Sequence, residues 1–195
     1  IGPKFLFPGI GYGGSCFPKD VRALLHTAQQ HGLDLPLVAA TDRINERQKL
    51  VLFDKVLRHF AATESTDEQP LRGRTVALWG LSFKPETDDI REATAIALCE
   101  RLVQAGATVR ATDPVAMQNA ERRLEGRVQL FADAYEAASG ADALLLCTEW
   151  RQYRQPNFRR LRDLMRGVGI FDGRNIWDSE QLRELGLIYH GIGRR

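Results

Sequence analysis

A chain of 195 residues with 44% apolar and 27% charged side chains has the composition of an ordinary globular protein of one or two domains. The net charge is +2 and the basic residues are spread along the chain, which argues against partners such as nucleic acids or membranes. No apolar run approaches the roughly 18 residues of a transmembrane helix. Three widely spaced cysteines disfavour a disulfide framework or a metal site, and they fit a reducing, cytoplasmic location.

A glycine-rich loop near the start of the chain ends at a cysteine. Five glycines fall within residues 2–14, and Cys16 follows closely. Glycine reaches backbone conformations closed to other residues, so such a loop can bring its N–H groups close to a polar ligand. Lys19 and a helix start lie just beyond Cys16, a setting in which a thiol is more reactive than in a core. We interpret Cys16 as a reactive thiol; the alternative is a small apolar core residue.

The same loop contains the spacing G-x-G-x-x-G at Gly9, Gly11 and Gly14. In a dinucleotide-binding fingerprint this spacing lies between a strand and a crossover helix, and the surrounding sequence predicts no such strand and crossover unit. The spacing is therefore interpreted as part of a substrate loop and not as a cofactor site.

Two helices are expected after the loop. The first runs over 20–31, with Asp20 as its N-cap and Gly32 after its end. The second runs over 36–60 and carries an apolar stripe near its end, which we expect to pack against a second copy of the chain. The stripe comprises Leu50, Phe53, Val56 and Leu57. A one-sided helix on a monomer is the alternative. Residues 61–72 lack periodicity and are interpreted as a linker.

From residue 73 onward, strands alternate with helices, which predicts an α/β domain over 73–195 with a doubly wound, Rossmann-like parallel sheet. The expected strands are 75–79, 108–112, 128–131, 143–147, 169–171 and 187–189. The expected helices are 89–104, 115–124, 134–139, 158–165 and 179–185. Asp88 or Asp89 is expected to cap the first of these helices, and Gly106 to follow its end. Residues 1–60 would form a helical dimerisation segment ahead of this domain.

Three blocks of sequence resemble the nucleotide-sugar 6-dehydrogenases, the UDP-glucose/GDP-mannose dehydrogenase family. The first block, residues 5–20, is similar to that family's nucleophile loop. The second, residues 80–92, is similar to its C-terminal nucleotide-binding segment, and the third joins 148–150 with 171–175. The blocks occur in family order and span almost the whole chain.

The resemblance implies that Cys16 is the nucleophile of a two-step oxidation of a primary alcohol to an acid. A thiolate adds to the intermediate aldehyde, the resulting thiohemiacetal surrenders a second hydride, and water cleaves the thioester. In the family the residue matching Asp20 helps to orient or activate that water; pure N-capping is the alternative role for Asp20.

The resemblance also implies ligand contacts. The substrate loop corresponds to Phe7, Pro8, Gly9, Ile10, Gly11, Tyr12 and Gly13. Phe83, Lys84 and Arg174 would contact the nucleotide sugar. Cys16, Lys19 and Arg91 would lie at the cofactor, with Arg91 on its diphosphate; the plain alternative for Arg91 is an ion pair with a neighbour such as Asp88. Asp113 resembles a ribose-binding acid, but the loop after Trp79 has only Gly80, so no second NAD site is expected.

The family's NAD-binding domain would precede residue 1, so we expect the C-terminal portion of an enzyme that oxidises UDP-glucose to UDP-glucuronate with NAD. The isolated chain is expected to be inactive and to form a homodimer through the helix at 36–60. Three alternatives stay open. They are an enzyme of the same family acting on GDP-mannose or a UDP-N-acetylhexosamine, a non-catalytic nucleotide-binding and dimerisation module, and a thiol hydrolase, for which Cys16 has no evident histidine partner.

Overall fold

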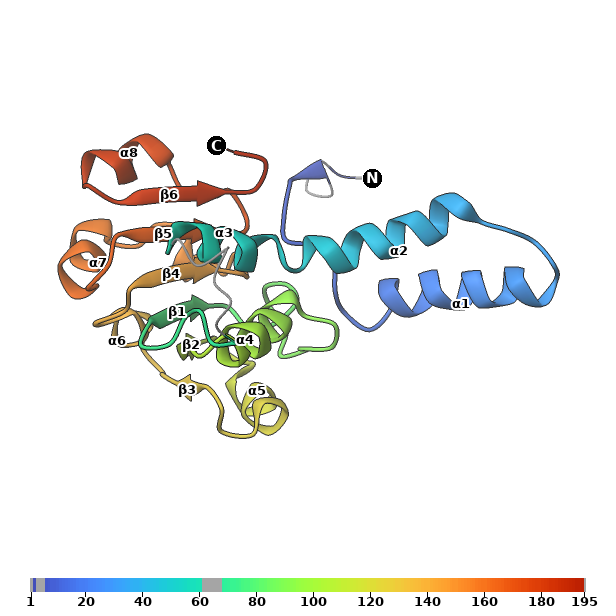
Figure 1. Cartoon of the computed structure of the whole chain (residues 1–195), viewed down its shortest axis with the longest axis horizontal. Coiled ribbons are helices and arrows are strands. Elements are labelled where there is room, and N and C mark those ends of the chain that lie inside the picture. The colour runs from blue at the N-terminus through green and yellow to red at the C-terminus, as the bar shows by residue number, and fades with distance from the viewer. Residues whose placement is uncertain (1, 3–5, 61–67, 195) are drawn as a thin grey trace.

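A computed structural model describes residues 2, 6–60 and 68–194. Its centre is a six-stranded, fully parallel sheet in the order β3-β2-β1-β4-β5-β6, which confirms the predicted Rossmann-like topology (Figure 1). The strands are β1 (Thr75–Trp79), β2 (Thr108–Thr112), β3 (Gln129–Leu130), β4 (Ala143–Leu146), β5 (Gly169–Asp172) and β6 (Ile188–Gly191). All six lie at or close to the predicted positions, because short apolar runs bounded by turn residues mark buried parallel strands well.

The two faces of the sheet bury separate apolar clusters. Side chains of β1 alternate between them, with Val76 and Leu78 on one face and Ala77 and Trp79 on the other. Helices α3 (Val51–His59), α4 (Thr94–Gln104) and α5 (Met117–Leu124) supply the first cluster. Helices α6 (Ala134–Ala138), α7 (Phe158–Leu164) and α8 (Ser179–Glu184) supply the second. A short 3-10 helix, Arg151–Tyr153, follows β4.

Helices α1 (Phe17–Gln30) and α2 (Pro36–Gln48) form an arm that projects from the α/β body (Figure 1). Gly32 follows α1 with φ +66°, as predicted. The start of α1 differs from the prediction, because Cys16 and not Asp20 occupies the N-cap position. Pro18 fits the first turn, where a missing N–H leaves no bond unmade, and Asp20 lies inside the helix with its N–H donated to the Cys16 carbonyl at 2.8 Å.

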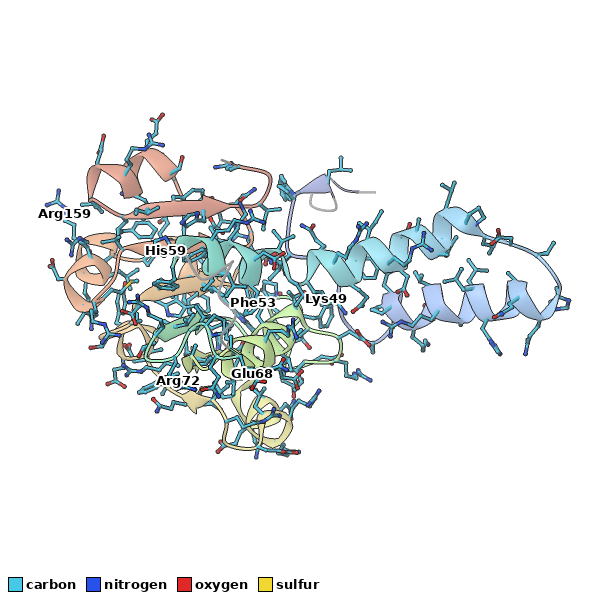
Figure 2. The ribbon with its side chains drawn as sticks, in the orientation of Figure 1. Lys49, Phe53, His59, Glu68, Arg72 and Arg159 are labelled. Atoms are coloured by element: carbon cyan, nitrogen blue, oxygen red, sulfur yellow. The ribbon has the colours of Figure 1, made fainter. Side chains whose placement is uncertain are left out.

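The predicted helix 36–60 is two helices, and the prediction that its apolar stripe packs on a second copy is wrong. The break falls at Lys49 and Leu50, between α2 and α3. Leu52 and Val56 are fully buried in the first core cluster, and Phe53, which is labelled in Figure 2, is 8% exposed. The stripe finds its partner within the chain, so it gives no reason for dimerisation. Nine large apolar side chains are exposed among the described residues, and five of them lie on the arm: Phe17, Leu24, Leu33, Leu37 and Ile44.

Two further boundaries differ from the sequence expectation. Helix α4 begins at Thr94 with Ala93 as its N-cap, because the Asp89 carboxylate accepts the Arg91 N–H instead of capping a helix. Residues 61–67 of the expected linker lie outside the described residues, while Leu71 is fully buried and its N–H bonds to the Ala105 carbonyl at 2.8 Å. None of the described helices combines the length and apolar character needed to cross a membrane.

Helix α3 and strand β6 bring two histidines together. The Nδ1 atom of His59 lies 3.2 Å from Nε2 of His190, and the His190 ring stacks on Phe171 with centroids 4.5 Å apart. Burial lowers the pKa of His190 to about 4, with smaller contributions from the charges of His59 and Lys55. Burial also lowers the pKa of His59.

The histidine pair predicts a loss of stability in mild acid. The unfolded chain binds a proton at His190 near the ordinary pKa of 6.5, whereas the folded chain does so only near 4. The unfolded state therefore binds more protons in this window, and the free energy of unfolding falls as the pH drops from 6.5 towards 4. His190→Phe keeps the stacking and removes this titration, so urea titrations should show a loss smaller by about 1–2 kcal/mol. An equally steep loss in the variant would contradict the assignment.

Candidate functional site

The glycine-rich loop is held to α2 and α4 by buried side-chain hydrogen bonds. Asn45, 4% exposed, accepts the Tyr12 N–H at 2.8 Å and donates to the Tyr12 carbonyl at 3.0 Å. Gln48 donates to the Gly9 carbonyl at 2.6 Å, and Thr94 donates its hydroxyl to the Ile10 carbonyl at 3.0 Å. These bonds fix the loop backbone at Gly9, Ile10 and Tyr12 and so define the shape of the loop.

Close packing explains why the end of the loop needs glycines. A Cβ atom at Gly13 would collide with the backbone of Glu92. A Cβ at Gly14 would lie 2.8 Å from the ring of Phe83, and Gly14 has φ +91°. The Gly14 N–H also donates to the Arg91 carbonyl at 2.8 Å. The loop is therefore seated directly on residues 83–92, so the structure brings the first two sequence blocks together.

Cys16 lies at the exposed start of α1, two residues after Gly14. Its sulfur is 3.8 Å from the Ser15 hydroxyl. The Asp20 carboxylate is one helical turn further on and lies 3.3 Å from the Lys19 amine, with both side chains exposed. Lys19 is thus the charged partner of Asp20 in this structure.

Arg91 belongs to the segment that supports the loop, because its carbonyl accepts the Gly14 N–H. Its guanidinium makes two bonds to Asp89, at 3.0 and 2.8 Å, so its partner is Asp89 and not Asp88. The hydrogen bond and charge of Asp89 raise the pKa of Arg91, and the charge of Cys16 adds a smaller part. The Arg91 side chain is 69% exposed, which leaves its outer edge open to an anionic ligand.

Arg174 joins the third sequence block to the other two. It donates to the Cys147 carbonyl at 2.8 Å and to the Phe83 carbonyl at 3.3 Å, and it lies 2.9 Å from the Glu149 carboxylate. A Cβ at Gly9 would lie 3.1 Å from its guanidinium. Arg174 therefore sits between the glycine loop and Phe83. The Lys84 amine lies over the Phe83 ring, 5.4 Å from the centroid.

The side chains of the predicted substrate loop do not all face solvent. Phe7 is 69% exposed and Pro8 is exposed, whereas Ile10 is 1% exposed and packs in the first core cluster. Any ligand contact of Ile10 must therefore use its backbone. The Tyr12 ring packs edge-on against Phe17, with centroids 4.5 Å apart.

Asp113 is a structural residue and not a ribose ligand. It is 1% exposed, and one oxygen accepts the Leu81 N–H at 2.7 Å and the Trp150 indole N–H at 3.0 Å. The other oxygen accepts the backbone N–H groups of Val115 and Ala116. Protein donors already occupy both oxygens, so the carboxylate ties together the loops that follow β1, β2 and β4.

Sequence reasoning missed Asn45, Gln48, Glu92 and Thr94. The clearest available signal was the polar stretch from Arg43 to Lys49 in an otherwise apolar helical pattern. Two polar side chains of that stretch, Asn45 and Gln48, bind the loop.

Two parts of the chain match domains of a known protein family. Residues 1–47 match the central domain of the UDP-glucose/GDP-mannose dehydrogenase family, and residues 77–179 match its UDP binding domain. The UDP-glucose 6-dehydrogenases of Pseudomonas aeruginosa and Rhizobium meliloti are 47% and 43% identical to this chain over its whole length. The chain covers 42% and 43% of those two relatives.

Solved structures agree as well. A UDP-glucose dehydrogenase from Pyrobaculum islandicum superimposes with a TM-score of 0.82 at 31% identity, over 98% of this chain and 40% of that one. The chain belongs to the UDP-glucose/GDP-mannose dehydrogenase family.

Proposed function

We propose that this chain supplies the nucleophilic cysteine and the nucleotide-sugar contacts of an NAD-dependent UDP-glucose 6-dehydrogenase. The observation that carries the proposal is the seating of the Cys16 loop on Phe83 and beside Arg174. This arrangement puts a thiol, a cation and an aromatic ring around one loop whose backbone can follow a sugar and its diphosphate.

The chemistry assigned to Cys16 is nucleophilic. Its sulfur would bond to the carbon of an aldehyde made from the primary alcohol, and the resulting thiohemiacetal carbon retains one hydrogen that can leave as hydride. Water then cleaves the thioester, which frees the acid and returns the thiol. Asp20, one turn along α1, would orient that water. NAD, when bound, would accept the hydride in each of the two oxidations.

The residues present fit a supporting role towards NAD. Arg91 offers an exposed guanidinium for a diphosphate, at the expense of part of its pairing with Asp89. Gly80, which follows β1, packs on Thr148, whose backbone nitrogen would lie 2.7 Å from a Cβ there. Its conformation thus serves packing, and no glycine fingerprint surrounds it. We assign the main NAD contacts to the dinucleotide-binding domain that is typical of the family.

The binding test uses calorimetry on the 195-residue chain with UDP, GDP and NAD in parallel. We expect weak UDP binding and scarcely any NAD binding. Arg174→Ala should lower the affinity for UDP at least about tenfold, because a charged contact is lost. Arg159→Ala, on the outer side of α7, is the matched control and should bind as the parent does (Figure 2).

Three results would count against the proposal. Tight, stoichiometric NAD binding would contradict the assignment of the main NAD contacts to a separate dinucleotide-binding domain. Preference for GDP would favour an enzyme acting on GDP-mannose. Binding of UDP unaffected by Arg174→Ala would remove Arg174 from the site.

The arm, and not α3, carries exposed apolar side chains that could meet a second copy of the chain. Leu24, Leu37 and Ile44 are 51%, 82% and 54% exposed on α1 and α2. Exposed apolar side chains on one projecting element favour a partner surface, and a two-fold copy is the simplest partner. We propose a homodimer through α1 and α2, in the reducing cytoplasm that a free reactive thiol needs.

A further inference from the structure

Glu92 lies where the arm, the cysteine loop and the α/β body meet. It precedes α4 with φ +53°, a left-handed conformation that is uncommon for a residue with a side chain. Its carboxylate accepts a bond from Arg22 of α1 at 2.9 Å and a bond from Lys49, after α2, at 2.8 Å. A single carboxylate of the body therefore binds both helices of the arm.

The backbone of the same segment supports the cysteine loop. Gly13 packs against the Glu92 carbonyl so closely that no Cβ fits between them, and the Gly14 N–H donates to the Arg91 carbonyl at 2.8 Å. The side chain and the backbone of Glu92 thus hold two separate parts of the molecule. Gly14 is two residues from Cys16, so loss of this support would move the thiol relative to Phe83 and the Arg91 side chain.

The two ion pairs at Glu92 differ in exposure, because the Arg22 and Glu92 side chains are 46% and 36% exposed whereas Lys49 is buried. The Lys49 side chain is 6% exposed and lies at the root of the arm (Figure 2). Burial acts to lower the pKa of Lys49, but its bonds to Glu46 and Glu92 outweigh burial and raise it. The hydrogen bonds from Arg22 and then from Lys49 lower the pKa of Glu92 to about 2. All three charges are therefore present at neutral pH.

Glu46 provides a comparison within the same network. Its carboxylate also reaches Lys49, at 2.8 Å, and Arg22, at 3.3 Å. Glu46 lies on α2, however, and the backbone that packs on Gly13 belongs to Glu92. Loss of Glu46 removes charge from the network and leaves the support of the loop in place.

We propose that Glu92 is a positioning residue. It holds Gly13 and Gly14 in place, and through them it fixes the position of the Cys16 thiol relative to Phe83 and Arg91. Its ion pairs to Arg22 and Lys49 fix the conformation in which its backbone supports the loop. The inference deepens the proposed function and rests on it only for its consequence in catalysis.

The test is amide hydrogen exchange on the full chain, read by mass spectrometry at the loop peptide that contains Gly14. Glu92→Gln keeps the size of the side chain and removes its charge. We expect the loop peptide to exchange at least tenfold faster, while peptides from β1 and β4 exchange as in the parent. Glu46→Gln is the matched control and should leave the loop within twofold of the parent. Glu92→Asp should restore part of the protection.

The outcomes separate positioning from general stability. Unchanged exchange at the loop in Glu92→Gln would overturn the proposal, and so would equal acceleration in the loop and in β1. Should Glu92→Gln fail to fold, Arg22→Gln breaks one of the same ion pairs from α1, and unchanged loop exchange there would overturn the proposal as well.

Kinetics of the native enzyme add a second readout. In Glu92→Gln we expect kcat for the oxidation of UDP-glucose to fall about tenfold with KM within twofold, since the thiol is displaced and the nucleotide contacts stay. If the parent enzyme does not oxidise UDP-glucose, the proposed function fails while the exchange result stands by itself. A fall in kcat equal to that in Glu46→Gln would overturn the inference.

Discussion

Cys16→Ser in the native enzyme is expected to lower the rate of net acid formation by at least about a thousandfold, while the protein still folds. Serine preserves the size of the side chain and its place at the start of α1. Its hydroxyl is not ionised near neutral pH and is a poor nucleophile towards an aldehyde without a general base. Because Cys16 is exposed, the free energy of unfolding should change by no more than about 0.5 kcal/mol.

The measurement is the rate of acid release from UDP-glucose, together with a thermal melt of each variant. Cys99→Ala is the matched control, since Cys99 is buried on α4 and burial raises its pKa well above the ordinary value. That variant should retain acid formation. Covalent trapping of the sugar on a residue other than Cys16 during turnover would refute the assignment, as would normal acid formation by Cys16→Ser.

The sequence predicted the sheet well because its signals are local. β1 and β2 match the predicted ranges, since β1 is a short apolar run and β2 is a short segment of β-branched and small residues that follows a turn at Gly106. The start of α4 could not be read in this way. Asp89 is a good N-cap residue type, but its carboxylate is taken by Arg91, and the chain needs a loop there to receive Gly13.

The helix predicted at 36–60 also shows what a local sequence signal leaves undecided. Its apolar stripe correctly predicted a buried face, but periodicity does not say which surface covers that face. The structure covers it with the chain's own sheet, because the break at Lys49 and Leu50 lets α3 turn onto the body. A dimer surface and a core face have the same spacing in sequence.

The candidate site was predictable where a motif carries it and not where a distant contact does. Cys16, Phe83 and Arg174 stood out because each belongs to a distinctive block, and the structure brings these blocks together. Asn45 and Glu92 support the loop from far along the chain: Asn45 bonds Tyr12, 33 residues away, and Glu92 bonds Lys49 across 43. Asp113 had the residue type of a ligand, but only the fold shows that protein donors saturate it.

Aspartate substitutions at two leucines are expected to differ in their effect on stability, because one leucine lies in the core of the body and the other on the surface of the arm. Leu52 on α3 is fully buried beside Ile10 and Gly173, so Leu52→Asp places an unpaired charge in the core. We expect it to reduce the free energy of unfolding by about 4 kcal/mol or more, and to lower Tm by roughly 10 °C. Leu37 on α2 is 82% exposed, so Leu37→Asp should change stability by no more than about 0.5 kcal/mol.

The two variants should also differ in assembly. Leu37→Asp puts a charge on the arm surface that we assign to the dimer, so the folded variant should dissociate at least about tenfold more readily in sedimentation experiments. Leu52→Asp should instead lose near-UV circular dichroism together with the sheet signal, because α3 is part of the body's core. A Leu52→Asp protein that folds but is monomeric would show that the α3 stripe belongs to the subunit interface. A dimer unaffected by Leu37→Asp would place the interface away from this part of α2, because a charge in the middle of an apolar contact is not tolerated.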